Sequence, residues 1–200
     1  MSGLQIKNGR RFMEVNLLVE DQIRECYARV AWTHKVQEKC ADKLLAMNQG
    51  LQWTQIILSV VTTSGLIGTI CGKNTTSTII AAIASAILLV VNAYSKNRNL
   101  VQLAHQHSLS AVALWHVRET YLSLLVDYKN GAKSDDEVRE IRDALQGQLT
   151  SVYKEMPRGF SSAYKAASKA LKVDEELTLH DAEIDGMLPH SLRRDNVPEG

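Results

Sequence analysis

One stretch of this chain is almost free of charge. Between Lys43 and Lys96 the only formally charged residue is Lys73, while the sequence on either side is densely charged. A helix that crosses a bilayer needs about 20 mostly uncharged residues, because it rises about 1.5 Å per residue through about 30 Å of hydrocarbon. The two apolar runs here are about that long. The sequence therefore predicts a transmembrane hairpin over 51–95, with spans at about 51–71 and 78–95 and a polar turn at 72–77.

The averaged composition hides this hairpin. The 200 residues include 45% hydrophobic residues and carry a formal net charge of +1, which is typical of a soluble domain. A near-neutral charge gives no reason to expect direct binding to nucleic acid. The alternative is a soluble helical bundle in which the hairpin is the core. Two consecutive helices that are apolar all round are hard to cover in a chain this short, which favours the membrane.

The segment 1–50 is predicted to be a cytosolic amphipathic helix, either unbroken or divided near Asn16. Apolar residues recur in it at helical spacing, and charged residues fill the positions between them. Positive residues flank both outer ends of the hairpin, at Lys43 and Lys96 among others, whereas the turn has only Lys73. Because positive residues stay on the cytoplasmic side, we expect two spans in the inner membrane with both termini cytoplasmic.

The segment 96–130 is predicted to be a long cytosolic helix of the coiled-coil type. Its apolar residues alternate in steps of three and four, which is the spacing of a helix that packs along a partner helix. We expect this face to join the subunits of a homo-oligomer. The predicted oligomer seam consists of Leu100, Leu103, His107, Ser110, Leu114, Val117, Tyr121, Leu124 and Tyr128.

Further cytosolic helices are predicted over 131–172. Asn130-Gly131 favours the end of the preceding helix, and Ser134 with Glu137 has the spacing of a capping box. Pro157 should end the helix that follows, and Ser161 or Ser162 should cap a short alanine-rich one. The tail 173–200 is acidic and then basic, and we expect it to be at best partly ordered. The complete chain is thus predicted to be an all-α membrane protein with a bundle of cytosolic helices.

Two sets of residues in the spans have chemical interest. Small residues at Ser64, Gly68 and Gly72, with Ala82 and Ala86 opposite, form ridges that favour close packing of the two spans. Three polar residues seven apart, Thr78, Ser85 and Asn92, share one line along the second span, and Asn99 and Gln106 extend it. These three are candidates to line a pore between assembled hairpins. The alternative is that they form hydrogen bonds between helices.

The sequence shows no sign of catalysis or of a cofactor. It has no glycine-rich phosphate loop, nucleophile elbow or HExxH motif, so we expect no enzyme activity. His105 and His107 are two residues apart and point in different directions on a helix, which disfavours a metal site there. His107 lies on the predicted seam, where a hydrogen-bonded core residue is the simpler interpretation. Three isolated cysteines indicate no disulfide framework.

The order of these parts resembles a known family. The amphipathic helix, the two-span hairpin and the helical stretches 104–115 and 118–125 (AHQHSLSAVALW and RETYLSLL) are similar to SLATT proteins, the SMODS- and SLOG-associating two-transmembrane effectors of bacterial conflict systems. The resemblance covers about residues 20–172. It implies an antiviral effector that oligomerises and permeabilises the inner membrane. It also implies activation by a nucleotide second messenger or by a sensor protein of the defence system.

Two alternatives from other classes stay open. A membrane-anchored helical scaffold would recruit cytosolic partners without forming a pore. A soluble sensor or enzyme subunit would bury the hairpin as its core.

Overall fold

The computed structural model describes residues 2–72, 75–180, 183–184 and 187, and side chains from residue 18 onward within these ranges. All regular structure in the described residues is helical. The elements are α1 (Ser2–Gly72), α2 (Thr75–Asn97), α3 (Leu100–Lys129), α4 (Asp135–Glu155) and α5 (Ser161–Lys172). Lys73 and Asn74 of the predicted turn, and the basic end of the tail, lie outside the described residues.

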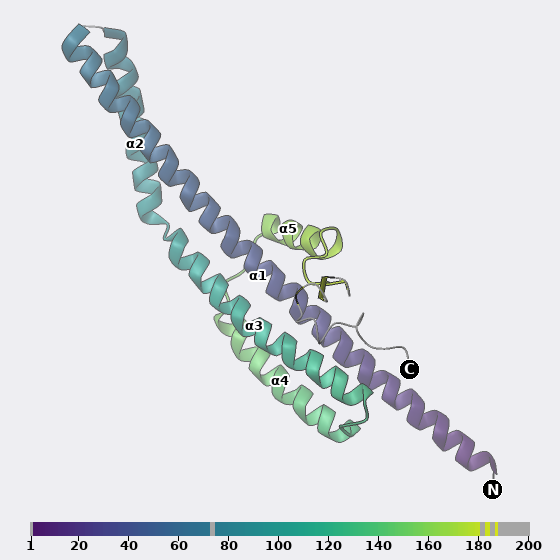
Figure 1. The fold of residues 1–200 in the computed structure, drawn as a ribbon. Coiled ribbons are helices and arrows are strands. Elements are labelled where there is room, and N and C mark those ends of the chain that lie inside the picture. Colours follow the sequence, from purple (N-terminus) through teal and green to yellow (C-terminus); the bar gives the residue numbers. More distant parts are fainter. Residues whose placement is uncertain (1, 73–74, 181–182, 185–186, 188–200) are drawn as a thin grey trace.

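A single helix, α1, extends through both the helical bundle and the hairpin. It has 71 residues, which corresponds to a length of about 105 Å at 1.5 Å per residue. No proline interrupts it, so no backbone donor is lost along its length. The predicted amphipathic helix and the first span are therefore one continuous helix, without a division near Asn16. In Figure 1, α1 runs from the N-terminus to the tip of the hairpin, and the other helices lie along it.

The hairpin consists of the last part of α1 and the antiparallel helix α2. In Figure 1 it extends beyond α3, α4 and α5, so α1 and α2 pack mainly on each other there. A break in the helix at 98–99 separates α2 from α3. The side chain of Asn99 caps α3 by accepting a hydrogen bond from the backbone N–H of Gln102 at 3.1 Å. Asn99 therefore begins a new helix and does not continue the polar line of α2 as predicted.

Helix α3 continues along α1 in the direction of α2, and α4 turns back, so that α1, α3 and α4 form a three-helix bundle (Figure 1). The turn between them contains Gly131, whose φ of +68° suits a residue without a Cβ. The predicted capping box at the start of α4 is present. The Ser134 hydroxyl accepts from the Glu137 N–H at 3.4 Å, and the Glu137 carboxylate accepts from the Ser134 N–H at 2.7 Å.

Helix α5 lies on a different side of α1 from α3 and α4 (Figure 1). The predicted alanine-rich helix is confirmed, and Ala163, Ala167 and Ala170 are its buried residues. The predicted serine cap is wrong, because the N-cap residue is Phe160 and no side chain bonds the first turn. Phe160 instead packs between α1, α3 and α5, next to Cys40 and Leu100.

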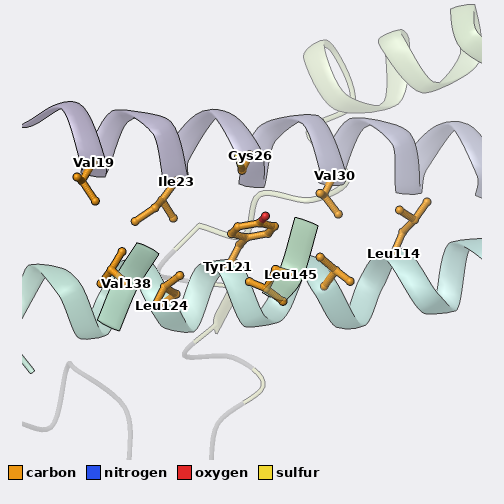
Figure 2. Packing of buried hydrophobic residues seen from close by; sticks show 10 residues of the cluster. Val19, Ile23, Cys26, Val30, Leu114, Tyr121, Leu124, Val138 and Leu145 are labelled. Atoms are coloured by element: carbon orange, nitrogen blue, oxygen red, sulfur yellow. The ribbon is translucent and has the colours of Figure 1, made fainter. Parts of the chain in front are cut away.

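The apolar core of the bundle lies where α1, α3 and α4 meet (Figure 2). Each fully buried aliphatic or aromatic side chain in such a core stabilises the fold by about 1.5–3 kcal/mol. This hydrophobic packing holds α3 and α4 against the N-terminal half of α1. The core residues are Val19, Ile23, Cys26, Val30, Leu114, Val117, Tyr121, Leu124, Val138 and Leu145.

Candidate functional site: the hairpin and a buried polar layer

The two helices of the hairpin approach each other closely at Gly65. A Cβ added there would lie 2.8 Å from the Ala81 Cβ and 2.9 Å from the Ser77 carbonyl oxygen. Only a glycine fits this contact, since a Cβ does not approach other atoms that closely. A Cβ at Gly68 would be in ordinary contact with Ser77, and one at Gly72 would meet nothing within 4 Å.

The small residues of the interface are therefore not quite the predicted ones. On α2, Ala81 and Ala84 are buried, whereas Ala82 and Ala86 are exposed. On α1, Ser64 is exposed next to the half-buried Gly65. Close packing through small residues is present, and Gly68 takes part in it, but Gly65, Ala81 and Ala84 occupy the interface in place of Ser64, Ala82 and Ala86. The spacing of small residues in the sequence predicted that they recur along one side of each helix. It did not determine which side of the helix faces the partner.

Hydrogen bonds between side chains of the described residues cross the hairpin near both of its ends. Thr69 and Thr78 bond through their hydroxyls at 2.8 Å, and the Gln55 amide donates to the Ser95 hydroxyl at 3.1 Å. The first bond gives Thr78 a partner within its own subunit. The second lies near the end of the hairpin that joins the bundle. Sequence reasoning missed Gln55 and Ser95, because a single polar residue at the edge of a span has no periodic signal.

The other pore-lining candidates, Ser85 and Asn92, are exposed on the surface of α2. They lie one position after Ala84 and Val91, which face α1, so the line borders the interface with α1 without entering it. Thr78 lies on the same line and is also exposed. The three positions thus form one polar line along α2, whose other exposed residues between Ile79 and Ala93 are apolar.

Apolar side chains cover most of the remaining hairpin surface. Among the described residues, two helices are long and apolar enough to cross a membrane. The most apolar 18-residue window is 0% buried within Leu18–Gly72 and 11% buried within Thr75–Lys129. No other helix in the described part of the chain covers these windows, which argues against the alternative in which the hairpin is a soluble core. The large exposed side chains include Ile56, Ile57, Val60, Leu66, Ile67, Ile70, Ile79, Ile80, Ile83, Ile87, Leu89 and Val90.

The predicted oligomer seam of α3 lies inside the subunit. Leu114, Val117, Tyr121 and Leu124 are at most 2% exposed and pack on α1 and α4 of the same chain. Leu100 packs on Leu44 of α1, and Leu103 remains 37% exposed. The spacing correctly indicated a partner helix, but the partner is α1 and not a second copy. Any contact between subunits on α3 would therefore need another face of this helix.

A buried polar layer crosses the bundle in the middle of α1. The His107 imidazole donates through Nδ1 to the Gln37 side-chain carbonyl, and the Gln37 amide donates to the Pro157 carbonyl oxygen at 3.4 Å. One turn away, His34 donates through Nδ1 to the Ala111 carbonyl oxygen at 2.9 Å. His107 and Gln37 are each 1% exposed. The layer therefore connects α1, α3 and the segment that leads into α5.

Burial determines the charge state of this layer. Desolvation lowers the pKa of His107, so the neutral imidazole is favoured. A neutral ring with one N–H fits the single bond that it donates to Gln37. The interpretation of His107 as a hydrogen-bonded core residue agrees with this geometry.

Charged residues close the outer side of the layer. Lys35 contacts the Glu38 carboxylate at 2.7 Å and the Glu176 carboxylate at 3.1 Å, and Lys39 contacts Glu176 at 2.9 Å. Burial lowers the pKa of Lys35, but the bonds to the two carboxylates outweigh this and leave it raised. The bonds from Lys39 and Lys35 lower the pKa of Glu176. The start of the tail after α5 is thus fixed to α1 by an ion-pair cluster.

No group of three or more metal-binding side chains gathers among the residues described. His107 is in the core, whereas His105 and His116 are exposed on other faces of α3. The three histidines therefore do not share a site.

The hairpin and the bundle define the class of this protein: a helical membrane protein with two spans. A family model described as "SMODS and SLOG-associating 2TM effector domain family 4" matches residues 19–183. The chain therefore belongs to the SLATT effector family, as its sequence had suggested. Comparisons with curated proteins and with solved structures gave no significant match. Membership identifies a two-transmembrane effector domain of conflict systems.

Proposed function

We propose that this protein is an effector that self-associates in the inner membrane and permeabilises it when a signal reaches its bundle. The observation that carries this proposal is the hairpin, whose apolar surface is exposed and whose polar line borders the packed face. A hairpin that served only as an anchor would have no need of such a line. When hairpins gather, the positions Thr78, Ser85 and Asn92 provide polar groups for an opening between them.

The proposed orientation places both termini and the bundle in the cytoplasm. Lys43, Lys96 and Arg98 lie at the end of the hairpin that joins the bundle, and positive residues favour the cytoplasmic side. Tyr94 lies at the same end, at the level that aromatic rings prefer. The bundle is then accessible to a nucleotide second messenger or to a sensor protein.

No Asp, Glu, Lys or Arg lies within either span in the sequence. A carrier that couples ions or protons uses such groups at the centre of the membrane. The proposed opening is therefore a weakly selective one that dissipates ion gradients.

The test combines a cellular and a reconstituted assay. Induced expression in a bacterial host should depolarise the membrane, measured with a potential-sensitive dye, and purified protein should release a small fluorophore from liposomes. Intact potential and tight liposomes at matched protein amounts would support the scaffold alternative instead.

Two charge insertions test the polar line. In the Ser85→Asp variant the new carboxylate would face the water-filled opening, so the protein should still insert. The opening should then become more selective for cations. Asp at Ile87, which is 47% exposed on the opposite flank of α2, costs about 2.5–3.5 kcal/mol in hydrocarbon and should prevent insertion. If both variants behave alike, the line does not contact water.

A further inference from the structure

Helix α3 has an apolar face that no other described part of the subunit covers. Two of its sides pack on α1 and α4, but a third exposes Val101 (51%), Val112 (65%), Trp115 (49%), Leu122 (39%) and Val126 (51%). These five residues are called the outer stripe. They are separated by steps of 11, 3, 7 and 4. With His105, Ser108 and Glu119 in the gaps, the positions alternate in steps of four and three, which is heptad spacing. The outer stripe therefore has the spacing of a seam for a partner helix.

The surface around the outer stripe is also nearly uncharged. Between Arg98 and Asp127 the only formal charges are Arg118 and Glu119, and these pair with each other at 2.6 Å. The surface of a soluble domain typically has about 25–35% charged residues. A neutral face without fixed charges of one sign matches an identical face, because no like charges are brought together except the internally paired ones.

A groove borders the stripe where α3 meets α1. It has a volume of about 250 Å³ and is lined by His34, Glu38, Ser108, Ala111, Val112 and Trp115. Each subunit thus offers both projecting apolar side chains and a hollow beside them. Such a pairing of knob and hole is what two copies of one surface need to interlock.

We infer that the outer stripe binds the outer stripe of a second copy, with the two α3 helices parallel and in register. This inference rests on the proposed self-association and names its interface in the bundle. The hairpin fixes every copy in one orientation and at one height in the bilayer, so identical stripes meet side by side. Over 101–126 the contact would extend about 38 Å at 1.5 Å per residue.

The apolar area of the outer stripe is small for an interface on its own, but it suits two subunits that the membrane already holds side by side. The exposed parts of the stripe present roughly 500 Å² of apolar surface per subunit, against about 800 Å² per partner in a standard interface. The exposed hairpins of the two copies can supply the remainder. Trp115, near the centre of the stripe, is the residue type that most often dominates such contacts.

Cysteine cross-linking in membranes tests the inference. In a Cys71→Ser background, the remaining Cys26 and Cys40 are buried, so a new cysteine on α3 reports its own contacts. Val112→Cys is placed on the stripe, and Gln106→Cys is the matched control, exposed on another side of the same helix. Oxidation should give at least fivefold more dimer for Val112→Cys. Equal yields, a higher yield for Gln106→Cys, or no dimer at either position would overturn the inference.

A charge on the stripe gives a second readout. Val112→Glu changes an exposed residue, so far-UV circular dichroism and the melting temperature should stay unchanged while cross-linking of Val126→Cys is lost. If that cross-link persists, the stripe is not the interface. Dimers without liposome leakage would contradict the proposed opening and leave this interface standing. Leakage together with cross-linking through Gln106→Cys would contradict this interface and leave the proposed function standing.

Discussion

The hydrogen bond between Gln37 and His107 should be destabilising when only one partner is removed. Both residues are 1% exposed, so Gln37→Leu leaves the imidazole N–H buried without an acceptor. An unsatisfied buried polar group costs about 1–3 kcal/mol, whereas replacing both partners with apolar groups is nearly neutral. We expect each single leucine variant to lose about 2 kcal/mol and the double variant less than about 1 kcal/mol. The coupling free energy of the pair should then be about 3 kcal/mol.

Thermal unfolding of the full chain in detergent micelles, followed by circular dichroism at 222 nm, measures these differences. One kcal/mol corresponds to about 2–4 °C in a chain of this size, so each single variant should melt about 4–8 °C below the parent. Gln106→Leu, on the exposed side of α3, is the control and should melt within about 2 °C of the parent. If the double variant loses as much as the two single variants together, the two residues are not coupled and the layer is not a hydrogen-bonded unit.

Four further outcomes are expected. Because burial lowers the folded-state pKa of His107, the unfolded chain binds the extra proton first, so stability should fall as pH drops below about 6.5. His107→Leu should flatten that dependence in urea titrations at pH 5–7. Gly65→Leu should separate the two hairpin helices and lower resistance to SDS, whereas Gly72→Leu, with open space around it, should not. Ser134→Ala should destabilise the bundle by about 1 kcal/mol in the same melts, because α4 loses its cap. Glu176→Gln should expose the segment after α5 to limited proteolysis, because Lys35 and Lys39 lose their charged partner.

Local signals in the sequence were sufficient to place the elements. The capping box at Ser134 and the turn at Gly131 each act within a few residues, and the apolar run after Leu51 acts within one continuous segment; each appears in the structure. Their physical causes lie within one segment of the chain: a backbone donor to satisfy, a positive φ to permit, and a length of hydrocarbon to match.

The partner of each face could not be predicted in the same way. The heptad spacing on α3 predicts that another helix packs on this face. A helix of the same chain can cover the face as well as a helix of a second copy can. Leu114 therefore looked like an oligomer contact and is a core residue. The same limit applies to the hairpin, where the choice of Ala81 over Ala82 depends on how α2 is rotated against α1. The bond from Gln37 to the Pro157 carbonyl joins residues 120 positions apart and has no local signal at all.

One face of α1 connects the bundle to the membrane. Residues at every seventh position, from Ile23 through Gln37 and Leu51 to Gly65, are buried or half-buried along it. This face contacts α3 within the bundle and α2 within the hairpin, so one continuous helix is packed on both. A change in the polar layer that rotates α1 has to move Gly65 against Ala81, where the contact leaves no spare room, unless α1 bends between them. The polar layer and the packing of the two spans are therefore connected by one face of α1.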